Sequence, residues 1–131
     1  MKRAIASFFI LLSVLMFFTG CVTRPGKSES IILHFHHHSG IDIDCELTGD
    51  EASDIRKMLS GKFLNLDSGV PSCGFSESVS IEIGGNLYCP ACDGCTSVYD
   101  ANKKRFFEIT AEERARLEEI FENHGGGFPC V

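Results

Sequence analysis

Hydrophobic and polar residues largely alternate along two stretches that flank a short turn. The stretches are residues 31–37 (IILHFHH) and 41–47 (IDIDCEL), and a period of two is typical of half-buried β-strands. Between them lie His38, Ser39 and Gly40, and three-residue hairpin loops commonly end in a glycine with positive φ. The pattern therefore predicts a β-hairpin in which His37 faces Ile41.

This pairing assigns every side chain of the hairpin to one of two faces. The apolar face consists of Ile31, Leu33, Phe35, Ile41, Ile43, Cys45 and Leu47. The polar face consists of His34, His36, Asp42, Asp44 and Glu46. A two-residue loop would place His36 opposite Ile43 and mix the two sets, so the three-residue register is favoured.

Two later segments begin and end with helix signals. Thr48 with Glu51, and Thr110 with Glu113, match the capping box, and each segment ends at a glycine. Between these signals, apolar residues recur at helical spacing: Ala52, Ile55, Met58 and Leu59 in the first segment, and Leu117, Ile120 and Phe121 in the second. The two segments align without gaps at an offset of 62 residues, which is compatible with an internal duplication or with convergence on favourable caps.

Short strand-like runs lie between the two helices, at residues 78–83, 87–88, 97–99 and 105–109. The resulting order, ββα-ββ-ββ-α, predicts an α+β domain in two layers. We expect an antiparallel sheet of five to six short strands with both helices on one face. Residues 62–75 are predicted to form a loop that Cys73 holds down.

The N-terminus has the organisation of a secretory signal. Two basic residues precede an apolar run over 4–18, and Cys21 follows a threonine and a glycine. This end resembles the lipobox of bacterial lipoproteins, with Phe18 where leucine is usual. The resemblance implies removal of residues 1–20, a diacylglycerol on the sulfur of Cys21, and a lipid-anchored protein outside the cytoplasm. An ordinary signal peptide or an uncleaved anchor are the alternatives.

The remaining chain is predicted to be one small domain. The polar, turn-rich residues 21–30 would form a flexible tether, and residues 31–131 a single cysteine-rich α+β domain. Without residues 1–20 the chain has ten basic and eighteen acidic residues, a net charge of −8. This charge disfavours nucleic acid as a partner and leaves attachment to the bilayer to the acylated Cys21.

Six cysteines follow Cys21, and an even number in a short exported domain is typical of a disulfide framework. They are Cys45, Cys73, Cys89, Cys92, Cys95 and Cys130. The sequence leaves their pairing open, but we expect a bridge between the 89–95 segment and either Cys73 or Cys130. Cys45 lies on the apolar hairpin face, where a buried free thiol would also fit.

Two other interpretations of the cysteines stay open. Cys89, Cys92 and Cys95 could bind a metal ion with a fourth ligand from Cys73, Cys130 or a histidine. The run 89–92 (CPAC) also resembles the C-P-x-C motif of thiol–disulfide oxidoreductases, which implies a reactive first cysteine at a helix N-terminus. Here the following residues favour turn and strand instead.

The polar face of the hairpin offers a second metal-binding hypothesis. His34 and His36 alternate along one strand, with Asp44 and Asp42 opposite, and this set suits zinc, copper or nickel. The alternative is a solvated face of His–Asp pairs.

No phosphate-binding loop, G-x-S-x-G elbow or H-E-x-x-H motif occurs, so we predict no catalytic residues and no cofactor, zinc being the alternative. The leading hypothesis is a non-catalytic, disulfide-stapled module that binds or inhibits an extracytoplasmic protein. Metal binding is the second hypothesis and thiol–disulfide exchange the third.

Overall fold

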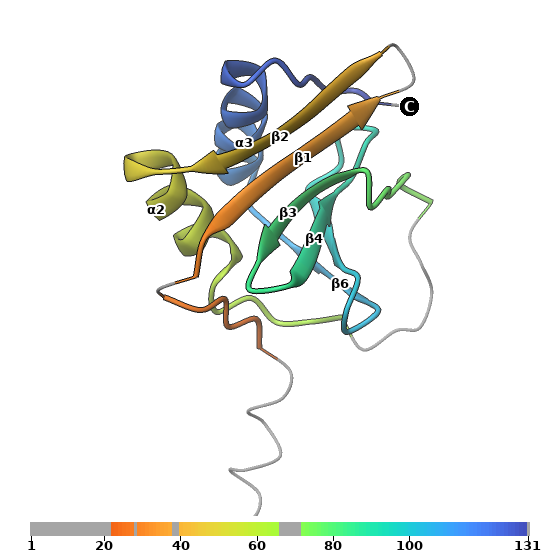
Figure 1. The fold of residues 1–131 in the computed structure, drawn as a ribbon. Coiled ribbons are helices and arrows are strands. Elements are labelled where there is room, and N and C mark those ends of the chain that lie inside the picture. The colour runs from red at the N-terminus through yellow and green to blue at the C-terminus, as the bar shows by residue number, and fades with distance from the viewer. Residues whose placement is uncertain (1–21, 28, 38–39, 66–71, 131) are drawn as a thin grey trace, which may run out of the picture.

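The computed structural model describes residues 22–27, 29–37, 40–65 and 72–130. These residues form one open six-stranded antiparallel sheet and two helices (Figure 1). The strands are β1 (Ile31–His37), β2 (Ile41–Leu47), β3 (Val79–Ile83), β4 (Asn86–Pro90), β5 (Ser97–Asp100) and β6 (Arg105–Glu108), and the helices are α2 (Gly49–Leu59) and α3 (Ala111–Asn123). The predicted α+β class and element order are confirmed. No described helix has both the length and the apolar character needed to cross a membrane.

The sheet has the strand order β2-β1-β3-β4-β5-β6. Helix α2 connects β2 to β3, which pairs with the other side of β1. Both helices cover the same face of the sheet (Figure 1). We call the opposite side the outer face, and its composition determines what the domain presents to its surroundings.

The predicted hairpin register is confirmed residue by residue. His37 pairs with Ile41, His36 with Asp42 and His34 with Asp44. Gly40 has a φ of +85°, as the three-residue loop requires, whereas His38 and Ser39 lie outside the described residues. The predicted apolar face points into the core: Ile31, Leu33, Phe35 and Leu47 are buried, and Ile41, Ile43 and Cys45 pack against that core.

The core lies between the sheet and the helices. The apolar stripes of both helices are buried as predicted. The ring of Phe121 on α3 contacts that of Phe35 edge-on, with centroids 6.1 Å apart. The ring of Phe128, in the C-terminal segment, also packs edge-on against Phe121, with centroids 5.1 Å apart. The segment after α3 therefore closes one end of the core.

The two predicted capping boxes have different outcomes. Thr110 and Glu113 form the box at the start of α3, but Thr48 makes no side-chain cap at α2. The carboxylate of Glu51 instead accepts a hydrogen bond from Asn123 (3.0 Å) and lies 2.8 Å from Nε2 of His124. The contact with His124, followed by that with Asn123, lowers the pKa of Glu51. The predicted capping box at α2 was wrong, because the Glu51 side chain contacts the end of α3 and does not turn back to the N-cap.

The chain packs against the domain from Val22 onward. The backbone N–H of Thr23 donates to the carbonyl of Lys62 (2.9 Å), and the Thr23 carbonyl accepts from Gly61 (3.0 Å). Thr23 is fully buried, and Val22 forms a β-bridge with Phe63. Val22 and Thr23, which belong to the predicted tether, therefore contact residues 61–63 of the domain.

Candidate metal centre on the outer face

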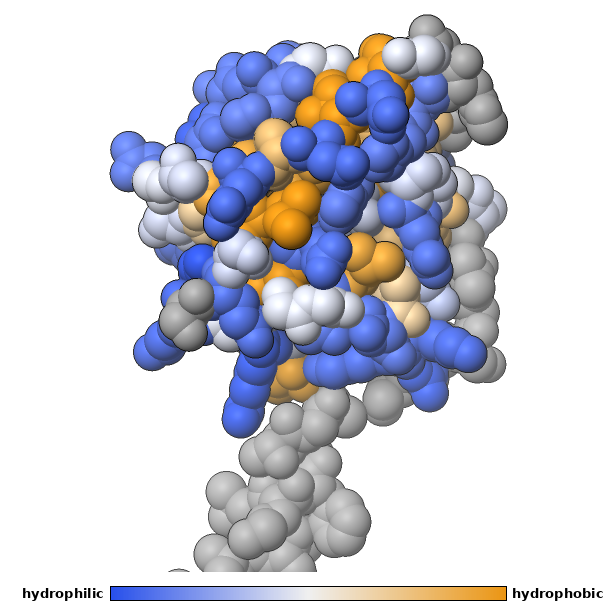
Figure 2. All heavy atoms as spheres, in the orientation of Figure 1, coloured by the Kyte–Doolittle hydropathy of each residue, from blue (hydrophilic) through white to orange (hydrophobic). Residues whose placement is uncertain are grey.

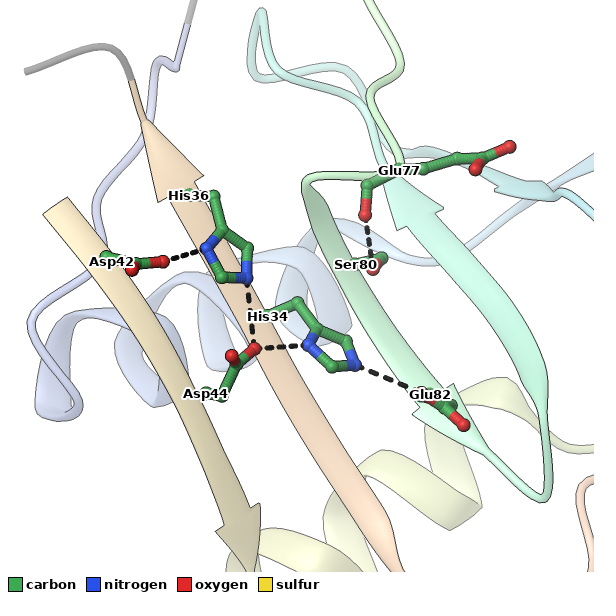
Figure 3. Close-up of polar contacts among 7 residues, drawn as sticks. All are labelled: His34, His36, Asp42, Asp44, Glu77, Ser80 and Glu82. Carbon is green, nitrogen blue, oxygen red and sulfur yellow. Dashed lines mark hydrogen bonds and ion pairs between the residues drawn. The ribbon is translucent and has the colours of Figure 1, made fainter. Parts of the chain in front are cut away.

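Four predicted site residues lie together on the outer face. Because strands alternate, His34 and His36 on β1 point away from the helices, and the hairpin register places Asp44 and Asp42 beside them (Figure 3). Seen from this side, the surface is mainly hydrophilic, with hydrophobic patches interspersed (Figure 2). The site therefore faces solvent and lies on a rigid sheet, not on a loop.

One carboxylate oxygen joins the two imidazole rings. Oδ1 of Asp44 lies 2.5 Å from Nδ1 of His34 and 3.0 Å from Nε2 of His36. The two rings are nearly parallel, with centroids 6.2 Å apart. The three donor atoms all lie within 4.8 Å of one another. We call His34, His36 and Asp44 the His–Asp site.

A second carboxylate contacts the remaining nitrogen of each ring. Nδ1 of His36 contacts Asp42, and Nε2 of His34 lies 3.2 Å from Glu82 on β3 (Figure 3). Asp42 was predicted as a possible ligand together with His34, His36 and Asp44, but it contacts the nitrogen of His36 on the far side of the ring from Asp44. Glu82 was not predicted, although alternation along residues 78–83 indicated its polar face, because the pairing of β3 with β1 is set by the topology.

The carboxylates alter the acid–base behaviour of the site. The hydrogen bond to Asp42, with a further one to Asp44, raises the pKa of His36. The hydrogen bonds of Asp44, first to His34 and then to His36, lower the pKa of that carboxyl. Three carboxylates around two imidazoles make the local charge negative when the rings are neutral, so the site attracts cations.

The geometry of the His–Asp site is compatible with zinc after a small rearrangement. Zinc bonds of about 2.0 Å to nitrogen and oxygen in a tetrahedron place ligand atoms about 3.3 Å apart. The two N–O distances of 2.5 and 3.0 Å would widen by less than 1 Å, and the two histidine nitrogens, which lie within 4.8 Å of each other, would approach to about 3.3 Å. The outer contacts with Asp42 and Glu82 match the arrangement in which a metal-bound histidine donates its other N–H to a carboxylate.

The six described cysteines are all free thiols. Sγ of Cys73 and Sγ of Cys95 lie, with a carboxylate oxygen of Asp93, within 4.8 Å of one another. The backbone N–H of Cys130 donates to the carbonyl of Cys92 (3.0 Å). The structure thus brings the 89–95 segment to both predicted partners without a bond. In the described part of the chain, no such convergence of donor atoms is found for the set Cys89, Cys92 and Cys95.

The CPAC run lies at the end of β4 and not at the start of a helix. Cys89 is 1 % exposed, and burial raises the pKa of its thiol to about 12. A reactive cysteine needs exposure and a lowered pKa, so both properties of Cys89 are opposite to those that activate a nucleophile.

No protein-family model matches this chain, and no curated protein or solved structure matches it significantly.

Proposed function

We propose that this protein binds a divalent transition-metal ion, zinc first, at the His–Asp site of a domain anchored to a bacterial membrane by lipid on Cys21. The observation that carries the metal proposal is that Oδ1 of Asp44 meets one nitrogen from each of two histidines. Imidazole and carboxylate donors suit zinc, and they also bind copper and nickel.

Charge balance favours metal binding at this position. Ionised carboxylates only accept hydrogen bonds, and each ring contacts a carboxylate at both nitrogens, so each ring donates from both. Two of these four protons, on Nδ1 of His34 and Nε2 of His36, point at Asp44. One divalent ion replaces these two protons with no change in net charge. The exchange keeps the outer contacts with Asp42 and Glu82, which orient the rings.

The site leaves room for a further ligand. The side chain of His34 is 21 % exposed, that of His36 37 % and that of Asp44 58 %. Three protein ligands leave at least one position of a zinc ion for water or another molecule. Such an accessible site suits an ion that is captured and released, or one that links the domain to a ligand with its own donor atom.

Zinc titration by calorimetry tests the metal proposal on the full chain in detergent, with free thiols alkylated so that cysteines do not bind the ion. We expect one zinc ion per chain. His36→Gln should weaken binding at least about 100-fold, because a direct ligand is lost. Asp42→Asn should weaken it by roughly 10–100-fold, because only an outer contact is lost.

The matched control is His124→Gln, which changes a half-buried histidine on the helical layer that contacts Glu51. Its zinc affinity should equal that of the unchanged protein. Absence of zinc binding, or binding that survives both His34→Gln and His36→Gln, would contradict the proposal and leave the solvated His–Asp face.

A surface feature supports the proposed anchor, although Cys21 itself lies outside the described residues. Phe63 is 80 % exposed, and among the described residues it is the one large hydrophobic side chain that is exposed to solvent. It pairs with Val22, the residue next to Cys21 in sequence. An acyl group on Cys21 would bring the apolar ring of Phe63 close to the bilayer surface, where exposed apolar side chains can bury at the boundary between headgroups and acyl chains.

Lipid attachment is tested by Cys21→Ser in bacteria grown with a labelled fatty acid. We expect the unchanged protein to carry the label and to sediment with membranes. The variant should lose the label and either leave the membrane fraction or keep its signal peptide, since it lacks the acceptor sulfur. Cys45→Ser is the control and should keep the label. An unlabelled wild-type protein would contradict lipidation. Binding or inhibition of an extracytoplasmic protein stays a prediction from the sequence.

A further inference from the structure

Four cysteines outside the His–Asp site form two neighbouring pairs. Each pair joins the 89–95 segment to a part of the chain far away in sequence. Cys73 lies beside Cys95, with their sulfur atoms within 4.8 Å. Cys130 lies beside Cys92, and its backbone N–H donates to the Cys92 carbonyl (3.0 Å). The backbone contact holds Cys92 and Cys130 close together before any covalent bond forms.

Two segments without regular secondary structure are attached through these pairs. The first contains Cys73 and crosses the outer face at β5, where the ring of Phe75 stacks on Tyr99 with centroids 5.5 Å apart. The carbonyl of Gly74 accepts from the N–H of Cys92 (2.7 Å). The second follows α3 and places Phe128 against Phe121. Both segments converge on Cys92, so a bond at each pair would close two loops of the fold.

The other two cysteines cannot bridge to each other. Cys45 lies on β2 and Cys89 on β4, with β1 and β3 between them. Three strand spacings separate β2 from β4 by about 14 Å, whereas bridged Cα atoms lie within about 7 Å. The two side chains also point to opposite faces of the sheet. Cys45 packs against the core, whereas Cys89 follows the inward-facing Tyr88 on β4 and therefore points to the outer face.

We propose that Cys73–Cys95 and Cys92–Cys130 are disulfide bonds of the exported protein and that Cys45 and Cys89 remain thiols. Each bond forms when two thiols lose two protons and two electrons to the disulfide of an extracytoplasmic thiol oxidase, which becomes a dithiol. Cross-links between distant residues restrict the unfolded chain most. The proposal depends on export but not on metal binding, since none of the four cysteines belongs to the His–Asp site.

Peptide mapping of the full chain tests this pairing. The protein is treated with N-ethylmaleimide during lysis, purified from membranes and digested without reductant. Cleavage after glutamate and before aspartate separates the relevant cysteines, because Glu77, Glu82 and Asp93 lie between them. Only Cys89 and Cys92 stay on one peptide, and fragmentation in the mass spectrometer distinguishes them. We expect two linked pairs, Cys73–Cys95 and Cys92–Cys130, and alkylated Cys45 and Cys89.

Thermal unfolding provides the second measurement. Reductant should lower the Tm of the unchanged protein by at least about 10 °C. Reductant should lower the Tm of the double variant Cys73→Ser/Cys95→Ser by less, since one bond is already absent. Cys45→Ser is the control and should keep both links. A Cys89–Cys92 link, alkylation of all six cysteines, or zinc released by a chelator from Cys73 and Cys95 would each overturn the proposal, and the mapping decides even if a variant does not fold.

Discussion

Phe35→Ala should lower the free energy of unfolding by about 3–5 kcal/mol, the usual cost of removing a buried phenylalanine side chain. Phe35 is 2 % exposed, and its ring packs edge-on against Phe121 and Phe128, with centroids 6.1 and 6.4 Å away. The backbone of Gly126 also comes close, since a Cβ there would lie 3.0 Å from the Phe35 ring. Removal of the ring therefore leaves a cavity among these side chains. Urea unfolding followed by circular dichroism measures it.

The control for this prediction is His36→Ala, at the next position along β1. Its side chain lies on the outer face and is 37 % exposed, so its removal leaves no core cavity. The loss for Phe35→Ala should be several times that for His36→Ala. Equal losses would contradict the assignment of the two faces and, with it, the exposed position of the His–Asp site.

The face assignment could be predicted because the hairpin depends on local information. The turn length, the glycine at position 40 and the alternation of both strands all favour one register, and a shift by one residue would bury the histidines. The neighbouring carboxylates Asp42 and Asp44 then follow without knowledge of the remaining fold. Most of the candidate site was therefore accessible from the sequence.

Contacts between distant parts of the chain were not accessible in this way. Glu82 reaches His34 only because β3, which follows α2 in the chain, pairs with the other side of β1. The same limit explains the capping box at α2. Thr48 and Glu51 have suitable types and spacing, but His124, 73 residues away, contacts the carboxylate that the box would need. Local propensity was overridden by a tertiary contact.

The cysteine pairs illustrate the same limit in a different form. Turn-rich sequence around Cys73 and Cys130 indicated that both need an anchor in the 89–95 segment, and the structure brings each of them there. Which cysteine meets which could not be chosen, since several pairings satisfy the same loop lengths. The tertiary structure supplies the missing information by placing Cys73 beside Cys95 and Cys130 beside Cys92, and the strand order keeps Cys45 apart from Cys89.

Arg114 connects several parts of the domain and was not predicted from the sequence to do so. It occupies a position on the apolar stripe of α3, three residues before Leu117, and it is 4 % exposed. Its Nη1 donates to the carbonyls of Ala91 (2.8 Å) and Cys95 (3.1 Å). A charged residue within an otherwise apolar stripe was the available signal, because such residues are rarely buried without partners.

The guanidinium of Arg114 holds the 89–95 segment from inside the domain. Nε donates to Glu118 (2.7 Å), and the guanidinium carbon lies 4.5 Å from the centroid of the Phe128 ring, a cation–π contact. One side chain therefore joins α3, the cysteine-bearing segment and the C-terminal segment. Arginine suits this position because its planar group has several donors in fixed directions.

Arg114→Leu should therefore destabilise the domain by about 3–5 kcal/mol, since two carbonyls lose their partner and the packing of the long side chain is lost. Arg114→Lys should recover part of this loss, because an ammonium group cannot reproduce the planar geometry. Arg116→Leu is the matched control, two residues along the same helix, where Arg116 pairs with Asp54 at the surface. Its effect should be much smaller. Urea unfolding gives the stabilities, and hydrogen exchange should show faster opening at the amides of Cys92 and Cys130 in Arg114→Leu alone. Equal losses for the two leucine variants, with unchanged exchange, would show that Arg114 does not hold this segment.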